Sequence, residues 1–153
     1  MYTVPIELGS TTTAVHLGQY HFLGIWFCID SLPDTGSSDL WVISDVCDTD
    51  ACKGSSAARY QSSSLNASGA SVTMNYGDST TGTYAGGPVA LEKATIAEVS
   101  ITGQYFAAVN ATNNTVVKSG AAGIIGLGFP AGRCIFILRF HLCWHTFIRD
   151  VPV

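Results

Sequence analysis

Asp34-Thr35-Gly36-Ser37-Ser38-Asp39-Leu40-Trp41-Val42 is the stretch of this sequence that most restricts its fold. Asp, Gly and Ser favour a tight turn, and the apolar run from Leu40 to Ile43 predicts a buried strand directly after it. The turn therefore carries one carboxylate, that of Asp34, and a carboxylate held in this way can act as a general acid or base. The other acidic residues nearby, Asp39 and Asp45, are expected to be solvated or to cap turns.

The composition of the whole chain is typical of an all-β domain. The chain has 153 residues, enough for one domain with a real core, and 47% of them are apolar whereas only 12% are charged. Gly, Ser and Thr are abundant and no long helical pattern occurs, which predicts strands separated by many turns. The net charge is −4 and the seven basic residues are scattered, which argues against a nucleic-acid partner.

Apolar alternation predicts further strands on both sides of the Asp34 turn. Residues 71–76 and 82–91 flank a Gly/Asp/Ser/Thr turn, so we expect them to form a hairpin. We expect a second antiparallel pair from residues 94–101 and 104–109, with its turn at Thr102-Gly103. The other predicted strands comprise residues 2–8, 12–17, 40–43 and 123–129.

Cys47 and Cys52 follow the Asp34 stretch, with four residues between them. In a secreted chain this spacing predicts a local disulfide, worth roughly 2 kcal/mol through loop-closure entropy, whereas two free thiols are the alternative in a reducing cytosol. Three triplets match the N-glycosylation acceptor pattern, and with the cysteine pair they favour the secretory route. Their asparagines are Asn66, Asn110 and Asn113.

Several other classes of signal are missing from the sequence. No secretory leader is visible, because Met1 is followed directly by Tyr2-Thr3-Val4-Pro5-Ile6. No apolar run reaches the roughly 18 residues that span a bilayer, so no membrane association is expected. No metal or other cofactor is expected, because the remaining cluster matches no zinc pattern. That cluster comprises Cys134, His141, Cys143 and His145.

Four features in this order resemble the amino-terminal lobe of the pepsin-like aspartic endopeptidases. The first is residues 34–42, and the second is the Cys47/Cys52 loop directly behind them. The third, Tyr76-Gly77-Asp78-Ser79, resembles the tip of the family's mobile flap, and the fourth, residues 123–129, resembles the strand beside the Asp turn. The resemblance implies one lobe of the pepsin-like double-ψ β-barrel fold. It also implies proteolysis through an Asp-activated water.

By this resemblance, Asp34 is one of two aspartates that share a proton and flank the attacking water. Like charges so close together cannot both ionise cheaply, so one carboxylate takes the proton of the water while the other donates to the peptide carbonyl. Thr35 would hydrogen-bond to the opposite lobe, Gly36 would let the backbone approach the carboxylate, and Ser37 would help to keep Asp34 ionised. Ordinary turn roles are the alternative for these residues.

The resemblance also implies how a polypeptide substrate is held. Tyr76 and Gly77 would lie on the flap over the substrate, with the Tyr76 hydroxyl paired to the Trp41 indole N–H. The alternative for Tyr76 is an ordinary cross-strand aromatic. Asp78 would accept a hydrogen bond from the substrate backbone or cap the turn. The apolar residues that would line either the cleft or the core are Ile124 and Phe129.

Two segments depart from the family pattern. Residues 18–33 are aromatic and aperiodic and end in Pro33, which lacks the backbone donor that a central strand needs. Residues 133–153 lack both turn punctuation and strand alternation. We therefore expect a lobe over residues 1–132 with an anomalous insertion at 18–33, followed by an irregular tail outside the family pattern.

One Asp-Thr-Gly turn is present, whereas the family uses two such turns. The first hypothesis is an amino-terminal lobe that is inactive alone and needs a missing carboxy-terminal lobe. The second is a single-lobe protease in which two copies each supply Asp34. The third is a non-catalytic β binding module. For the parent enzyme, the resemblance implies a secreted or vacuolar location.

Overall fold

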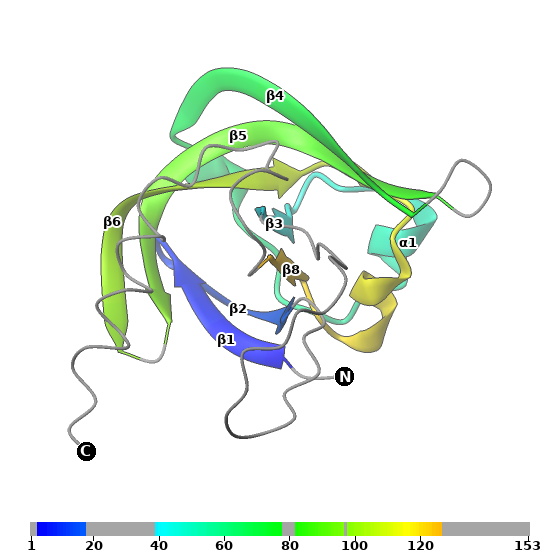
Figure 1. The fold of residues 1–153 in the computed structure, drawn as a ribbon, viewed down its shortest axis with the longest axis horizontal. Helices are drawn as coiled ribbons and strands as arrows, with labels where there is room; N and C mark the ends of the chain where they lie inside the picture. Colours follow the sequence, from blue (N-terminus) through cyan, green and yellow to red (C-terminus); the bar gives the residue numbers. More distant parts are fainter. Residues whose placement is uncertain (1–2, 18–38, 78–81, 97, 127–153) are drawn as a thin grey trace, which may run out of the picture.

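The computed structural model describes residues 3–17, 39–77, 82–96 and 98–126, which form a curved sheet of eight strands (Figure 1). The strands are β1 (Thr3–Leu8), β2 (Thr11–Leu17), β3 (Leu40–Ile43), β4 (Ala67–Tyr76), β5 (Thr83–Ile96), β6 (Val99–Val109), β7 (Ala111–Thr112) and β8 (Gly123–Ile125). The helical elements are α1 (Asp50–Lys53) and the 3₁₀ turns η1 (Ser62–Ser64) and η2 (Thr115–Ser119). This architecture confirms the expected all-β class.

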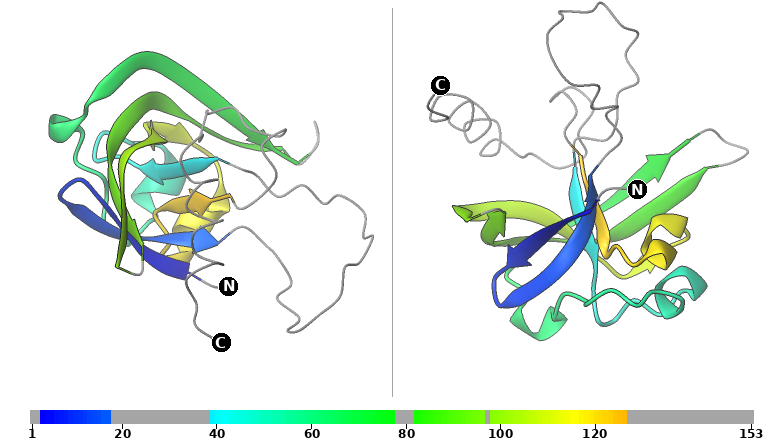
Figure 2. Two further views of the ribbon diagram at one scale, coloured as in Figure 1. Left: turned by 60° about the vertical axis from the view of Figure 1, so that its left-hand side comes forward. Right: turned by 90° about the horizontal axis from the view of Figure 1, so that it is seen from below.

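The sheet curls along its strand order, which is β1-β2-β8-β3-β6-β5-β4, with β7 paired to β5. β1 also pairs with β5, through Glu7 opposite Thr95 and Leu8 opposite Ala94. The first strand therefore meets β5 at one end of the curl. In consequence β4, β5 and β6 arch around β3 and β8, as Figure 1 and Figure 2 show.

β3 lies between β8, to which it is antiparallel, and β6, to which it is parallel. Its four residues Leu-Trp-Val-Ile are all buried, which explains why they form a continuous apolar run instead of an alternating one. β8 is likewise buried at all three positions. The structure thus confirms the strand predicted at residues 40–43. Of the strand predicted at 123–129, residues 123–125 form β8, Gly126 lies beyond its end, and residues 127–129 lie outside the described ranges. The strand that follows Asp34 in the sequence is thus paired along both edges.

The predicted hairpin of residues 71–76 and 82–91 is confirmed. β4 and β5 are antiparallel, with Tyr76 opposite Thr83 at the end of the ladder. Both strands are longer than expected, because β4 already begins at Ala67 and β5 continues to Ile96. β4 is the last strand in the sheet order and pairs with β5.

The predicted turn at Thr102-Gly103 is wrong, because β6 runs through both residues. Between the pairs Glu92–Gln104 and Ala94–Ile101, β5 advances by two residues and β6 by three. The additional residue forms a bulge, and Gly103 adopts the positive φ of 71° that such a bulge assigns to glycine. The ladder between the two strands instead begins at Ile96 opposite Val99, beside Glu98 with a φ of 69°.

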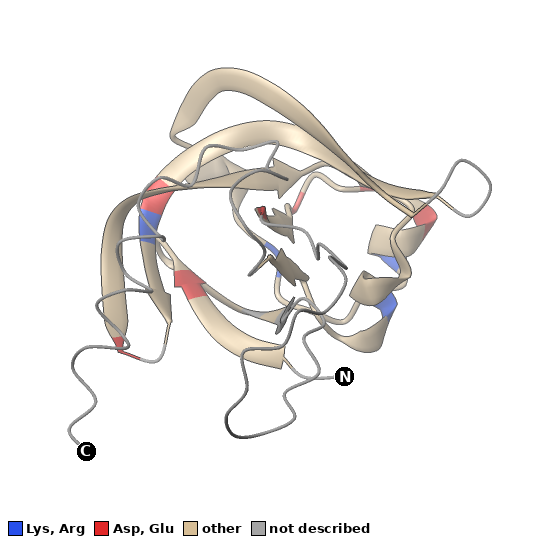
Figure 3. Cartoon of the chain, viewed as in Figure 1, with Lys and Arg blue, Asp and Glu red and all other residues tan. Residues whose placement is uncertain are grey.

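Charged residues in the described part are dispersed along the strands and helical turns, and Figure 3 shows the Lys and Arg positions of that part distributed over several elements. None of the helices in the described ranges has the length and apolar character needed to cross a bilayer. The segments for which an insertion and an irregular tail are expected, residues 18–33 and 133–153, lie outside the described residues.

Candidate active site

The described part of the predicted site begins at β3 and extends to the end of the β4–β5 hairpin. Trp41, on β3, has no exposed surface, and its indole Nε1 donates a hydrogen bond of 2.8 Å to Tyr76 Oη. The Tyr76 oxygen also lies 4.0 Å from the sulfur of Met74 on the same strand. This is the Trp41–Tyr76 pairing that the resemblance implies. After Tyr76 the chain turns at Gly77, which has a φ of 80°.

The Trp41–Tyr76 hydrogen bond joins strands that are not neighbours. β6 and β5 lie between β3 and β4 in the sheet order, so the two side chains meet only because the sheet curls. Burial of the Trp41 N–H makes a partner necessary, since an unpaired buried donor is costly. The sequence allowed this pairing to be anticipated, but the curl that permits it was not visible in any local pattern.

We expect Tyr76→Phe to lower the free energy of unfolding by about 1–3 kcal/mol, because it leaves the buried Trp41 donor without this acceptor. Tyr84→Phe, on the facing strand, is the control, since the hydrogen bonds formed by Tyr84 use its backbone groups. Urea denaturation of both variants measures the difference. Equal unfolding midpoints would show that the Trp41–Tyr76 bond contributes nothing to stability.

The remaining predicted site residues are described only in part. Asp34, Thr35, Gly36 and Ser37 lie outside the described residues, as do Asp78 and Phe129. Ile124 is described: it lies opposite Trp41 in the β8–β3 ladder and is 9% exposed. In this structure it belongs to the hydrophobic core, which was one of the two alternatives for it.

Two residues beside β3 have roles that sequence reasoning missed. Asp39, expected to be solvated or a cap, is only 3% exposed, so the solvated alternative is wrong for it; its carbonyl accepts a hydrogen bond of 2.9 Å from Gly126 N. Gly123 faces Val42 so closely that a Cβ there would lie 1.8 Å from the Trp41 carbonyl oxygen. The Gly-rich composition of residues 123–128 was the available signal for this close approach.

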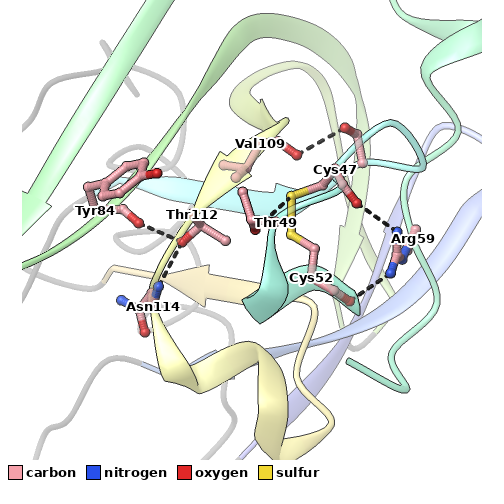
Figure 4. The surroundings of a disulfide bond; sticks show 9 residues. Cys47, Thr49, Cys52, Arg59, Tyr84, Val109, Thr112 and Asn114 are labelled. Carbon is pink, nitrogen blue, oxygen red and sulfur yellow. Dashed lines mark hydrogen bonds between the residues drawn. A yellow bond between two sulfur atoms is a disulfide. The ribbon is translucent and has the colours of Figure 1, made fainter. Parts of the chain in front are cut away.

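The expected disulfide between Cys47 and Cys52 is present, and it closes the loop directly behind β3 (Figure 4). The Arg59 guanidinium fastens this loop, donating from one nitrogen to the Cys47 carbonyl at 2.9 Å and from the other to the Cys52 carbonyl at 2.6 Å. A short helix that was not predicted, α1, begins at Asp50 inside the loop. The disulfide and the two Arg59 hydrogen bonds therefore make the loop a cross-linked support next to the end of β3.

Two ionisable groups near this support are perturbed. Asp45 Oδ1 accepts a hydrogen bond of 3.0 Å from Ser62 N, so it caps a turn as expected, and hydrogen bonds from Ser62 lower the pKa of Asp45. Burial raises the pKa of the Tyr60 hydroxyl, which donates at 3.1 Å to Glu92. These are structural interactions, and neither involves the residues predicted for catalysis.

All three asparagines predicted as glycosylation acceptors are exposed. Asn113 also has a local role, because its Oδ1 accepts a hydrogen bond of 2.7 Å from Tyr84 N. No group of three or more His, Cys, Asp or Glu side chains in the described ranges is arranged to hold a metal ion. The cysteine and histidine cluster of residues 134–145 lies outside those ranges.

Comparison with known proteins gives one family. Residues 30–136 match the family model for eukaryotic aspartyl protease. An aspartic protease of Phaffia rhodozyma is 37% identical over 98 residues, which cover 64% of this chain and 23% of that protein. Penicillopepsin-3 of Penicillium janthinellum is 29% identical over 130 residues, which cover 85% of this chain and 28% of that protein.

Solved structures give the same fold. An aspartic proteinase from Irpex lacteus matches with a TM-score of 0.55 and 20% sequence identity, over 86% of this chain and 29% of that one. This match confirms the expected pepsin-like fold. The chain spans about a quarter of the length of the curated relatives named above.

Proposed function

The chain belongs to the eukaryotic aspartyl protease family, and from this premise we propose that it supplies the amino-terminal half of an aspartic endopeptidase site. The observation that carries the proposal is the 2.8 Å hydrogen bond from Trp41 Nε1 to Tyr76 Oη. It ties the strand that follows the Asp34 turn to the end of the β4–β5 hairpin. A polypeptide substrate would lie between these two segments.

In the proposed reaction Asp34 is the catalytic residue. It shares one proton with a second carboxylate, because two negative charges at hydrogen-bonding distance repel each other and split their titrations. The ionised member takes a proton from a water that attacks the peptide carbonyl, and the protonated member donates to the carbonyl oxygen. Thr35, Gly36 and Ser37 hold Asp34, while Tyr76, Gly77 and Asp78 contact the substrate.

In this proposal the second carboxylate is not supplied by this sequence, because the sequence contains one Asp-Thr-Gly motif. A carboxy-terminal lobe is the first source, and a second copy of this chain is the other. The buried Trp41 and the Cys47–Cys52 loop behind β3 favour a two-lobed enzyme, since they match the pepsin-type pattern. As a monomer the chain is therefore inactive.

The proposal is tested by supplying the missing half. The chain is fused to the carboxy-terminal lobe of a relative such as penicillopepsin-3, and cleavage of denatured haemoglobin is measured at about pH 4, where one carboxylate of such a pair carries the shared proton. Pepstatin, an inhibitor of this family, is added in parallel. We expect pepstatin-sensitive cleavage that falls by at least roughly 10³-fold in Asp34→Ala.

Asp48→Ala is the matched control, because Asp48 is an exposed carboxylate in the disulfide loop. It should leave cleavage unchanged. Cleavage by a folded fusion that is insensitive to Asp34→Ala would contradict the proposed role of Asp34. Strong cleavage by the unfused chain, with a monomer mass by light scattering, would contradict the need for a second carboxylate. The same activity from a dimer would favour the second copy as the source.

We further propose that the parent enzyme is secreted or vacuolar and is glycosylated at Asn66, Asn110 or Asn113. The disulfide supports this, because such bonds persist in oxidising compartments. We also propose that residues 1–132 form the lobe, with an insertion at 18–33, and that residues 133–153 lie outside the family pattern. The end of the family match at residue 136 lies close to that boundary. Limited proteolysis, which removes chain outside a compact unit, tests these bounds.

A further inference from the structure

A short polar segment holds the end of β5 where the regular ladder stops. β7 pairs with β5 through Ala85 opposite Thr112 and Gly86 opposite Ala111. The next residue of β5 toward the hairpin end is Tyr84, and both of its backbone groups are held by side chains. Tyr84 N donates to Asn113 Oδ1 at 2.7 Å, and the Tyr84 carbonyl accepts from Thr112 Oγ1 at 2.5 Å. At Tyr84 the side chains of Thr112 and Asn113 thus form the hydrogen bonds that a neighbouring strand would otherwise supply.

Asn114 continues the arrangement by one residue. Its Nδ2 donates to Thr83 Oγ1 at 3.2 Å, while its Oδ1 accepts from Val116 N at 3.0 Å and so caps η2. The Thr112 hydroxyl in turn accepts from Asn114 N at 3.0 Å (Figure 4). Thr112, Asn113 and Asn114, which we call the latch, therefore connect the end of β5 to a capped helical turn.

The latch acts on the strand that faces Tyr76. In the β4–β5 ladder, Tyr76 lies opposite Thr83 and Asn75 lies opposite Tyr84. In an antiparallel pair the N–H and C=O of one residue point to the same side. Because both groups of Tyr84 bind the latch, they face away from β4, so β5 is held between β4 and the latch at this level.

We propose that the latch is a positioning element that fixes Tyr76 over Trp41. Its three side chains restrain β5 at Thr83 and Tyr84. Tyr76 of β4 is paired with Thr83, so the restraint on β5 also limits the movement of Tyr76. This inference rests on the proposed function in one respect, namely that Tyr76 contacts substrate. The latch residues themselves touch neither substrate nor the reacting atoms.

The chain offers variants that isolate the latch. Asn113→Ala removes the acceptor for Tyr84 N and also destroys the glycosylation triplet that begins at residue 113. Asn113→Asp keeps an acceptor oxygen but also destroys the triplet, and Thr115→Ala destroys it without changing residue 113. Thr83→Val removes the hydroxyl that binds Asn114 and leaves the cap of η2 intact.

The readout is hydrogen exchange of the Trp41 indole N–H, followed by NMR in the full chain without substrate. The chain has three Trp residues, and Trp41→Phe identifies this resonance by its loss. Since Trp41 is fully buried and bonded to Tyr76, exchange requires Tyr76 to move away. We expect Asn113→Ala and Thr83→Val to accelerate this exchange by at least about tenfold, with Asn113→Asp and Thr115→Ala within about twofold of the parent chain.

The amide of Ile43, the last residue of β3, is buried and donates a hydrogen bond of 2.7 Å to the Ala122 carbonyl, so its exchange separates positioning from general stability. Its exchange should be unchanged in Asn113→Ala and Thr83→Val. Equal acceleration at Trp41 and Ile43 would reduce the latch to a stabilising contact and overturn the proposal. So would faster exchange at the Tyr84 amide with no change at Trp41. Both results come from hydrogen exchange and do not depend on catalysis. A failure of this proposal is therefore distinguishable from a failure of the proposed role of Asp34, which the fusion protein tests.

Discussion

Replacing Gly123 by alanine should lower the free energy of unfolding by more than about 4 kcal/mol, a loss beyond that of ordinary point mutations. The new Cβ would lie 1.8 Å from the Trp41 carbonyl oxygen, 2.7 Å from its carbonyl carbon and 2.8 Å from Val42 Cα. These are backbone atoms, so no side-chain rotation relieves the overlap. β3 cannot move aside either, because its other edge is paired with β6.

Gly54→Ala is the control for this prediction. A Cβ at Gly54 would lie 3.4 Å from its closest neighbour, the Asp50 carbonyl oxygen, and the residue has an ordinary φ of −81°. We expect a change within about 1 kcal/mol, as at most surface positions. Urea denaturation followed by circular dichroism compares the two variants. If Gly123→Ala unfolded at the same urea concentration as Gly54→Ala, β8 would not pack against β3 as described.

The parts of the fold that the sequence predicted well are those whose signal is local. The continuous apolar run Leu40–Ile43 predicted a short buried strand, and the structure has that strand with these bounds. The Cys47–Cys52 spacing likewise predicted its disulfide. For the site, the resemblance implied the Trp41–Tyr76 pairing, because it supplied a long-range relation that no local pattern contains.

The errors arise where one local pattern fits two structures. Gly103 between two apolar runs fits a turn and a bulge equally well, and pairing with β5 decides for the bulge. Asp39, acidic and preceded by a polar run, fits a solvated and a capping position equally well, and its 3% exposure excludes the solvated one. The latch was not foreseen, since Thr112 and Asn113 contact Tyr84, which lies 28 and 29 positions away in the sequence.

Phe106→Ala should cost about 3–5 kcal/mol, the range for removing a large aromatic side chain from a core. Phe106 lies on β6, is fully buried, and packs edge-on against the ring of Tyr60 with ring centroids 5.0 Å apart. Tyr60 is itself buried and donates its hydroxyl to Glu92 on β5. A cavity at residue 106 would therefore remove contacts from a ring whose position is fixed at its other end.

Tyr105→Ala is the internal control for this prediction, because adjacent strand residues point to opposite faces and Tyr105 is 39% exposed. We expect it to change stability by less than about 1 kcal/mol in the same urea titration. A similar loss for both variants would mean that the two faces of β6 are not distinguished as the structure has them. If Phe106→Ala lowered the free energy of unfolding by much less than about 3 kcal/mol, the core would have collapsed around the missing ring. In that case Ala107, which pairs with Trp41, should shift, and the Trp41 indole resonance would report the movement.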